Sequence, residues 1–245
     1  GADCVKFQMF NSQRLWGDDR IKHLELPEAA FKALHAHCQE VGIEFLCTPF
    51  GVEEVEFLNQ LVRRWKVASG CLTKRQLLHA VRDTKKPVIL STGMSDVGMI
   101  GQALNFLGHS PTHTDFSLLH CTSSYPCPIK EVNLAAMDVL HWQWGNHPQH
   151  SQGSGFGPRL TCKIGYSDHT SGIVVPIAAV AMGAEIIEKH LTMDRKQEGP
   201  DHKASIEPET FRIMVQAIRD VEKAIGVEVK KCQPSEEKTR KAWYP

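Results

Sequence analysis

Short apolar runs alternate with longer amphipathic segments along almost the whole sequence. A short apolar run bounded by turn residues is typical of a buried strand, and apolar residues at helical spacing are typical of a helix packed on a sheet. Because strand and helix patterns alternate seven times, they predict parallel β-α-β units. The predicted strands are Cys4–Phe10, Ile43–Pro49, Trp65–Ser69, Pro87–Thr92, Phe116–Thr122, Cys162–Ser167 and Ala184–His190. The predicted helices are Pro27–Val41, Val52–Leu61, Lys74–Thr84, Asp96–Leu107, Leu134–Leu140, Ile173–Met182 and Pro208–Ile225.

Two α/β architectures accommodate such units: an open doubly wound sheet and a closed TIM (β/α)₈-type barrel. An open sheet gathers its ligand groups at one switch point. Here nearly every predicted strand ends in polar side chains, as strands do at the catalytic face of a barrel. The pattern favours the barrel, and since seven units are visible, we expect the missing first βα unit to precede Gly1. The polar strand ends are Lys6, Gln8, Thr48, Lys66, Ser69, Ser91, Thr92, Thr122, Ser123, Tyr125, Ser167, Asp168, His169, Glu188 and His190.

The composition suits one large soluble domain. The 245 residues are 42% hydrophobic and 23% charged with no net charge, so charge predicts neither nucleic-acid nor membrane binding. No apolar run approaches the ~20 residues of a membrane span, and the start has no signal-peptide pattern. The eight cysteines form no C-x-x-C pair, which predicts reduced thiols in a cytoplasmic protein.

We expect the barrel to occupy residues 1–226, with a surface insertion at about 141–160. The insertion holds three histidines and a glycine-rich run. Because no strand feeds into the glycines and no Lys-Ser/Thr pair follows them, a phosphate loop is not favoured. Residues 227–245 are polar and basic without a core pattern, which predicts a linker or a disordered end.

Two lysines and four hydroxyls at the predicted barrel mouth form a candidate anion pocket. A single lysine at a strand end is commonly a solvated tip, but two lysines on converging strands argue for a bound anion. Ammonium groups and short hydroxyls suit a phosphate and a carboxylate, and the mouth of a TIM barrel often binds phosphate. The members are Lys6, Lys66, Thr48, Ser69, Ser91 and Ser167.

Two histidines at neighbouring strand ends form a candidate metal site. His169 lies just after the predicted strand Cys162–Ser167, His190 ends the predicted strand Ala184–His190, and the two can approach each other at the rim. Two neutral imidazoles with water and substrate oxygens suit a divalent cation such as Mn²⁺. Asp168 and Glu188 lie beside them in the sequence and could orient the imidazoles or move protons.

Eight motifs occur in order along the chain: GADCVKFQ, FLCTPF, KVASG, ILSTGM, LLHCTSSYPCP, IGYSDHT, EKHLTMD and GPDHKASIEPETF. Together they resemble the bacterial-type sialic acid (N-acetylneuraminate) synthase family, including the legionaminic acid synthases. The resemblance runs from Gly1 to about Gly226, interrupted at 141–160. It implies a transferase that condenses phosphoenolpyruvate with N-acetylmannosamine or a related N-acetylated aminosugar.

The resemblance also implies a role for each site residue. Lys6, Lys66, Thr48, Ser69, Ser91 and Ser167 would bind phosphoenolpyruvate, with both lysines acting in catalysis. Tyr125 and Asp201 would contact the sugar in catalysis, and Ser123, where several relatives carry Asn, would lie near both substrates. His169 and His190 would bind the metal, Mn²⁺ first and Mg²⁺ or Co²⁺ as alternatives.

The family resemblance implies parts that this chain does not show. A first-strand glutamate acting on the sugar would precede Gly1, and a C-terminal antifreeze-like domain would complete the site of a partner subunit in a homodimer. A catalytically silent barrel that binds a ligand or partner therefore stays open as an alternative to the enzyme. A divalent-metal hydrolase is a third reading, which leaves the two phosphate-facing lysines unexplained.

Overall fold

The computed structural model describes residues 1–108, 115–145 and 162–244. Each of the seven predicted strand segments overlaps one observed strand, and all paired strands are parallel. The α/β class is therefore confirmed. The strands are β1 (Cys4–Met9), β2 (Glu44–Pro49), β3 (Trp65–Val67), β4 (Val88–Ser91), β5 (Phe116–Cys121), β6 (Lys163–Asp168) and β7 (Ile187–Lys189).

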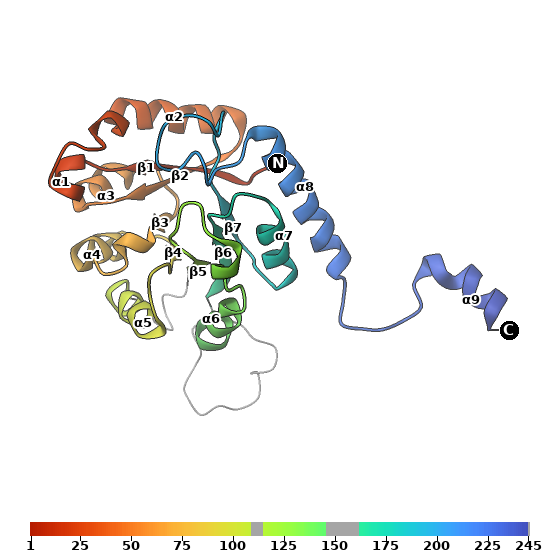
Figure 1. Cartoon of the computed structure of the whole chain (residues 1–245). Coiled ribbons are helices and arrows are strands. Elements are labelled where there is room, and N and C mark those ends of the chain that lie inside the picture. The colour runs from red at the N-terminus through yellow and green to blue at the C-terminus, as the bar shows by residue number, and fades with distance from the viewer. Residues whose placement is uncertain (109–114, 146–161, 245) are drawn as a thin grey trace.

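The strands form two parallel sheets that curl around a common concave face. β1 pairs with β2, and β3 to β7 pair in sequence order. Figure 1 shows β2 beside β3, so the two sheets follow one another around the curve. Lys6 Nζ on β1 lies 3.3 Å from Glu188 Oε1 on β7, which brings the first and last strands together across the concave face. The predicted closed eight-stranded barrel is not confirmed, because the described residues contain seven strands in two sheets.

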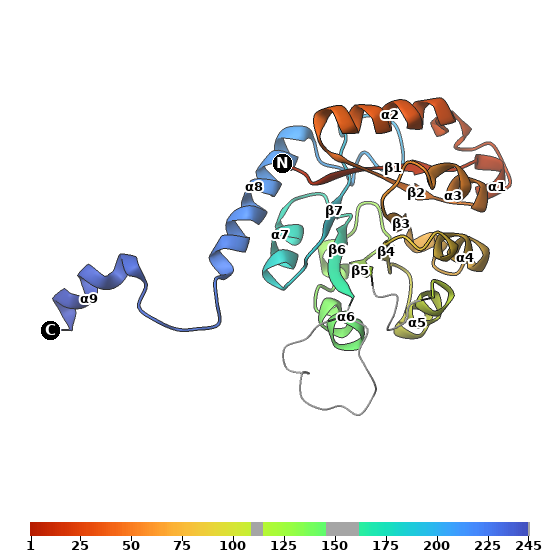
Figure 2. The ribbon, with the colours of Figure 1, turned by 180° about the vertical axis from the view of Figure 1, so that it is seen from behind.

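Helices cover the convex side of the sheets, as Figures 1 and 2 show from opposite directions. Their apolar faces pack on the outward-facing side chains of the strands in one large core that includes Trp65, Leu118 and Ile164. α8 matches its predicted bounds. The helices are α1 (Ser12–Trp16), α2 (Glu28–Val41), α3 (Val52–Leu58), α4 (Arg75–Asp83), α5 (Val97–Phe106), α6 (Ala136–Trp144), α7 (Val174–Ala181), α8 (Pro208–Ile225) and α9 (Glu237–Trp243).

A small second core lies on the concave face. It consists of Leu46, Ile89 and Leu119, with Ile186 packed against them. Gly165 is the register partner of Leu119, and a Cβ at this glycine would lie only 2.4 Å from the Ile186 carbonyl oxygen. Glycine is thus required for the close approach between β6 and the chain entering β7. These apolar residues lie on the concave face below the polar residues at the strand ends.

Two boundaries differ from the sequence-based expectations. The helix predicted at Leu134–Leu140 continues to Trp144 as α6, and the remainder of the insertion predicted at about 141–160 lies almost entirely among residues 146–161, outside the described residues. The segment after α8 leads away from the sheets, yet it contains a 3-10 turn, Pro234–Glu236, and helix α9 (Figure 2). Neither element buries a residue.

Candidate active site

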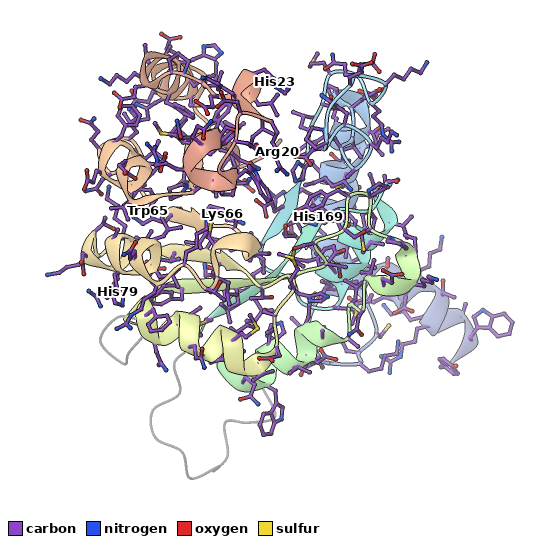
Figure 3. The ribbon with its side chains drawn as sticks, turned by 60° about the vertical axis from the view of Figure 1, so that its left-hand side comes forward. Arg20, His23, Trp65, Lys66, His79 and His169 are labelled. Atoms are coloured by element: carbon purple, nitrogen blue, oxygen red, sulfur yellow. The ribbon has the colours of Figure 1, made fainter. Side chains whose placement is uncertain are left out.

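Strand register brings the polar residues of neighbouring strands onto one face. Because side chains alternate across a strand, partners at the same level of a parallel sheet point the same way. Ser167 on β6 is the register partner of both Cys121 on β5 and Glu188 on β7, so all three point to the concave face. We call the carboxyl-terminal end of this concave face the mouth. Lys66 on β3 and His169 after β6, both labelled in Figure 3, belong to it.

Glu188 lies between the two predicted phosphate-binding lysines. Its Oε1 is 3.3 Å from Lys6 Nζ, and its Oε2 is 3.3 Å from Lys66 Nζ. Ser167 Oγ donates a 2.6 Å hydrogen bond to Oε2, and Lys66 Nζ donates a 2.7 Å bond to Ser91 Oγ. Three of the predicted residues therefore contact one carboxylate, which the sequence places close to His190, and Ser91 is joined to it through Lys66. The alternation that puts Glu188 and His190 on one face could have located it.

Burial and the neighbouring charges shift the pKa of Glu188 in opposite directions. Burial would raise the pKa of Glu188, but Lys66, Lys6 and the Ser167 hydrogen bond outweigh it and hold that pKa well below its usual value. The side chain of Lys66 is only 5% exposed, and burial lowers its pKa against the attraction of Glu188. The result is an ionised carboxylate that offsets part of the positive charge of the two lysines.

Thr48 is buried at the same mouth without a hydrogen-bond partner. The residue is 1% exposed, and its Oγ1 has no partner among the described residues. A buried hydroxyl left unpaired costs about 1–3 kcal/mol, so a hydrogen bond to a ligand would offset this cost. Thr48 is therefore a suitable contact for a bound substrate oxygen.

Cys121 connects three further predicted site residues. Its Sγ lies 3.6 Å from Ser69 Oγ, 3.8 Å from Ser123 Oγ and 3.8 Å from His169 Nδ1. Gly93 closes the same group, because its backbone N–H donates a 2.9 Å bond to Ser69 Oγ. A Cβ on Gly93 would lie 2.2 Å from Ser123 Oγ, so only glycine fits. Sequence reasoning missed both Cys121 and Gly93.

The two histidines and Tyr125 form a cluster of rings. The centroids of His169 and His190 are 5.3 Å apart, and Tyr125 lies 4.2 Å from His169 and 5.8 Å from His190. Burial lowers the pKa of both histidines, that of His190 to about 3 with help from Lys6 and His169. Both imidazoles are consequently neutral near pH 7, as metal ligands must be.

The histidine pair fits a divalent cation with further positions open to water and substrate. His169 Nδ1 donates to the Thr122 carbonyl at 3.1 Å, which leaves the lone pair on Nε2. This arrangement is common for a histidine that binds metal through its other nitrogen. Among the described residues there is no group of three or more His, Cys, Asp or Glu side chains arranged to hold a metal. The protein itself would thus supply two ligands.

Asp201 reaches the ring cluster from the loop after β7. Its Oδ2 lies 3.8 Å from His190 Nδ1, and burial raises the pKa of its carboxyl group. Ser205 Oγ donates to the Asp201 carbonyl at 2.8 Å, and Thr192 Oγ1 lies 2.7 Å from His202 Nδ1. These bonds hold the loop so that Asp201 faces the mouth.

Asp168 lies elsewhere. It points away from the mouth and is hydrogen-bonded to Lys189, Tyr166 and Thr170. Its hydrogen-bond partners do not include either imidazole, because alternation along β6 places its side chain on the opposite face from Ser167 and His169, and this arrangement does not support the expectation that it moves protons there.

A sequence profile of the NeuB family matches residues 1–230. The chain belongs to the NeuB family. Among curated NeuB relatives, the N,N'-diacetyllegionaminic acid synthase of Campylobacter jejuni is 38% identical over 97% of this chain and 73% of its own length. The N-acetylneuraminate-9-phosphate synthase of Mus musculus is 31% identical over 96% of this chain and 66% of its own length.

Solved structures agree with the NeuB assignment. The N-acetylneuraminic acid (sialic acid) synthetase of Leptospira borgpetersenii, solved in complex with citrate, has a TM-score of 0.84. It is 33% identical, and the match covers 98% of this chain and 80% of that one. A phospho-2-dehydro-3-deoxyheptonate aldolase from Thermotoga maritima has a TM-score of 0.68 at 17% identity, a likeness of fold alone.

The mouth of this NeuB chain thus brings together the eleven residues to which the family resemblance gives a role, whereas Asp168 lies outside it. Lys6, Lys66 and Ser167 contact Glu188, and Ser91 bonds to Lys66; Ser69 and Ser123 lie around Cys121; His169, His190, Tyr125 and Asp201 form the rim, and Thr48 is buried on β2. Across the described parts of the chain, no helix is long and apolar enough to span a membrane.

Proposed function

We propose that this protein is a nonulosonic acid synthase that condenses phosphoenolpyruvate with N-acetylmannosamine or a related N-acetylated aminosugar. One observation carries the proposal: Lys6 and Lys66 both reach one carboxylate at 3.3 Å, directly beside a pair of neutral imidazoles. Two cationic groups suit a phosphate, and neutral imidazoles suit a cation. The NeuB relatives named as legionaminic acid and N-acetylneuraminate-9-phosphate synthases support this class of reaction.

Phosphoenolpyruvate carries a phosphate and a carboxylate, and the mouth offers donors for both. Lys6 and Lys66 would neutralise the phosphate, and the Thr48 hydroxyl would gain the partner that it lacks. Ser91 and Ser167 already bond to Lys66 and Glu188, so they hold the charged groups in place. The incoming anion would compete with Glu188 for the two ammonium groups.

The reaction joins C3 of phosphoenolpyruvate to the aldehyde carbon of the open-chain sugar. Water adds at C2, and the C2–O bond to the phosphate then breaks, with Lys6 and Lys66 stabilising the leaving dianion. Tyr125 and Asp201 would hold the sugar hydroxyls beside the imidazoles. A divalent cation held by His169 and His190, Mn²⁺ or alternatively Mg²⁺ or Co²⁺, would polarise the aldehyde oxygen when bound.

A phosphate-release assay tests the proposal. The protein is incubated with phosphoenolpyruvate, Mn²⁺ and a panel of N-acetylated aminosugars; release should require both the sugar and the cation. His190→Ala should lose cation-dependent release, whereas His37→Ala, on the exposed face of α2, should keep it. Binding of phosphoenolpyruvate without turnover on any sugar would favour the silent ligand-binding barrel.

Isotope labelling tests the bond that breaks. In H₂¹⁸O the label should enter the sugar acid and not the released phosphate, because water attacks carbon. Label in the phosphate would contradict C–O cleavage. The cysteine usage further suggests a cytoplasmic protein, and the family resemblance suggests a homodimer of the full-length protein, which its mass in solution would check.

A further inference from the structure

We propose that the buried Asp168–Lys189 ion pair is a positioning device that sets the distance between the His169 and His190 imidazoles. The inference rests on the proposed function, in which these imidazoles hold a cation. Neither residue of the pair touches the mouth. Both act through the backbone of the residue that follows.

The Asp168–Lys189 pair lies at the carboxyl end of the paired strands β6 and β7. Asp168 and Lys189 are register partners and are the last residues of β6 and β7. His169 and His190 each follow one residue later. Because side chains alternate along a strand, the ion pair lies on one face of the sheet and the histidines on the other. The pair is thus the last tie between the two strands before the chain reaches the imidazoles.

Lys189 holds the residues on both sides of His169. Its Nζ donates to Asp168 Oδ2 at 2.7 Å and also to the Thr170 carbonyl. The backbone of His169 is therefore fixed at both neighbours by the residue that directly precedes His190. His169 also accepts a 2.9 Å bond at its carbonyl from Cys127 N–H, which ties in the loop that carries Tyr125.

Asp168 is saturated with donors. Its Oδ1 accepts from Tyr166 Oη at 3.0 Å and from Thr170 N at 3.1 Å, and its Oδ2 accepts from Thr170 Oγ1 at 3.0 Å as well as from Lys189. With all these bonds made, the carboxylate has one orientation. A directional network of this kind fixes geometry to a degree that apolar packing does not.

The complete burial of the Asp168–Lys189 pair indicates that it contributes more to the positions of its neighbours than to the free energy of unfolding. Both side chains are 0% exposed. Removing two charges from water offsets much of their attraction, so an apolar pair of similar volume is often equally stable. An apolar pair would, however, supply no directional bond to Thr170. Stability and positioning can consequently be separated by substitution.

The test uses the double variant Asp168→Leu/Lys189→Met, which removes both charges together. Its control is Glu44→Leu/Arg64→Met, which removes an ion pair between the start of β2 and the residue before β3, with N–O distances of 2.8 and 3.1 Å, at the opposite end of the strands from the mouth. Three quantities are measured in the full chain: the Tm, the Kd for Mn²⁺ by calorimetry, and the nuclear Overhauser effect between the His169 and His190 rings without metal.

We expect the double variant to fold, to bind Mn²⁺ about 10–100-fold more weakly, as loss of an outer-shell partner does, and to lose ring contact. The control variant should keep the wild-type Kd for Mn²⁺ and the wild-type ring contact. A folded double variant with unchanged Kd and unchanged ring contact would overturn the positioning role. If the wild-type protein does not bind Mn²⁺, the proposed metal role fails, while the metal-free ring contact still decides the positioning role.

A milder variant covers the case in which the double variant does not fold. Thr170→Val keeps the shape of the side chain and deletes one hydrogen bond to Asp168. A weaker ring contact and a smaller rise in Kd are expected, with no change in the control. An unchanged ring contact in this variant would contradict the proposal.

Discussion

Replacing Lys66 with methionine separates the stabilising from the catalytic role of the charges in the mouth. Lys66 Nζ lies 3.3 Å from Glu188 Oε2, and two unit charges at that distance attract by about 5 kcal/mol at an effective dielectric of ~20. Desolvation of the buried ammonium offsets part of this attraction, and Glu188 keeps Lys6 and Ser167. We therefore expect Lys66→Met to lower the free energy of unfolding by about 2 kcal/mol and the Tm by roughly 4–8 °C.

The double variant Lys66→Met/Glu188→Gln removes both charges and should recover most of the lost Tm. Phosphate release should stay low in both variants, with kcat/KM reduced by roughly 10²–10³, because a donor to the developing phosphate charge is gone. Lys86→Met is the control, since Lys86 lies just before β4, at the opposite end of the strands from the mouth, and donates to the Val62 carbonyl at 2.9 Å. Wild-type kcat/KM in either variant, or a double variant no more stable than Lys66→Met, would refute the reasoning.

Three further perturbations test individual residues. Thr48→Val removes an unpaired buried hydroxyl, so thermal unfolding should show a gain of about 1 kcal/mol while the KM for phosphoenolpyruvate rises; an unchanged KM would contradict the contact. Gly93→Ala should cost about 1–3 kcal/mol through the clash with Ser123, whereas Gly70→Ala, with open space around its Cβ, should cost far less. In the metal-free protein, His190 has a folded pKa of about 3, below its unfolded value near 6.5, so its stabilising effect is lost as pH falls from 6.5 toward 3. His190→Asn should flatten denaturant-measured stability over that window by up to ~1.4 kcal/mol per pH unit; an unchanged slope would show that His190 is not buried in its neutral form.

The order of strands and helices and the residues of the mouth were predictable from the sequence. The sequence shows both the helical spacing of apolar residues and the two-residue alternation of strands. Apolar runs with helical segments between them marked every strand, and alternation within a strand marked the inward face. Glu188 was placed on the inward face correctly, but its partners Lys6 and Lys66 were not predicted, because alternation gives the face of a residue and not its contacts. Its attraction to Lys6 depends on the curl that brings β1 to β7, which sequence spacing does not encode.

Other features depend on tertiary contacts alone. Cys121 reads in the sequence as one more buried thiol, and only the packing of Ser69, Ser123 and His169 around it reveals its place. Asp168 has the residue type of a proton carrier, but the parity of β6 turns it toward Lys189. The extension of α6 and the presence of α9 likewise lack a strong periodic pattern, so local propensity was a poor guide to their bounds.

Anomalous diffraction from crystals of the protein grown with Mn²⁺ and phosphoenolpyruvate would locate the cation and the phosphate together. We expect a manganese peak bound by His169 and His190, with the phosphate within hydrogen-bond distance of Lys6 and Lys66. A manganese peak away from both imidazoles, or a phosphate beyond the reach of both lysines, would contradict this expectation.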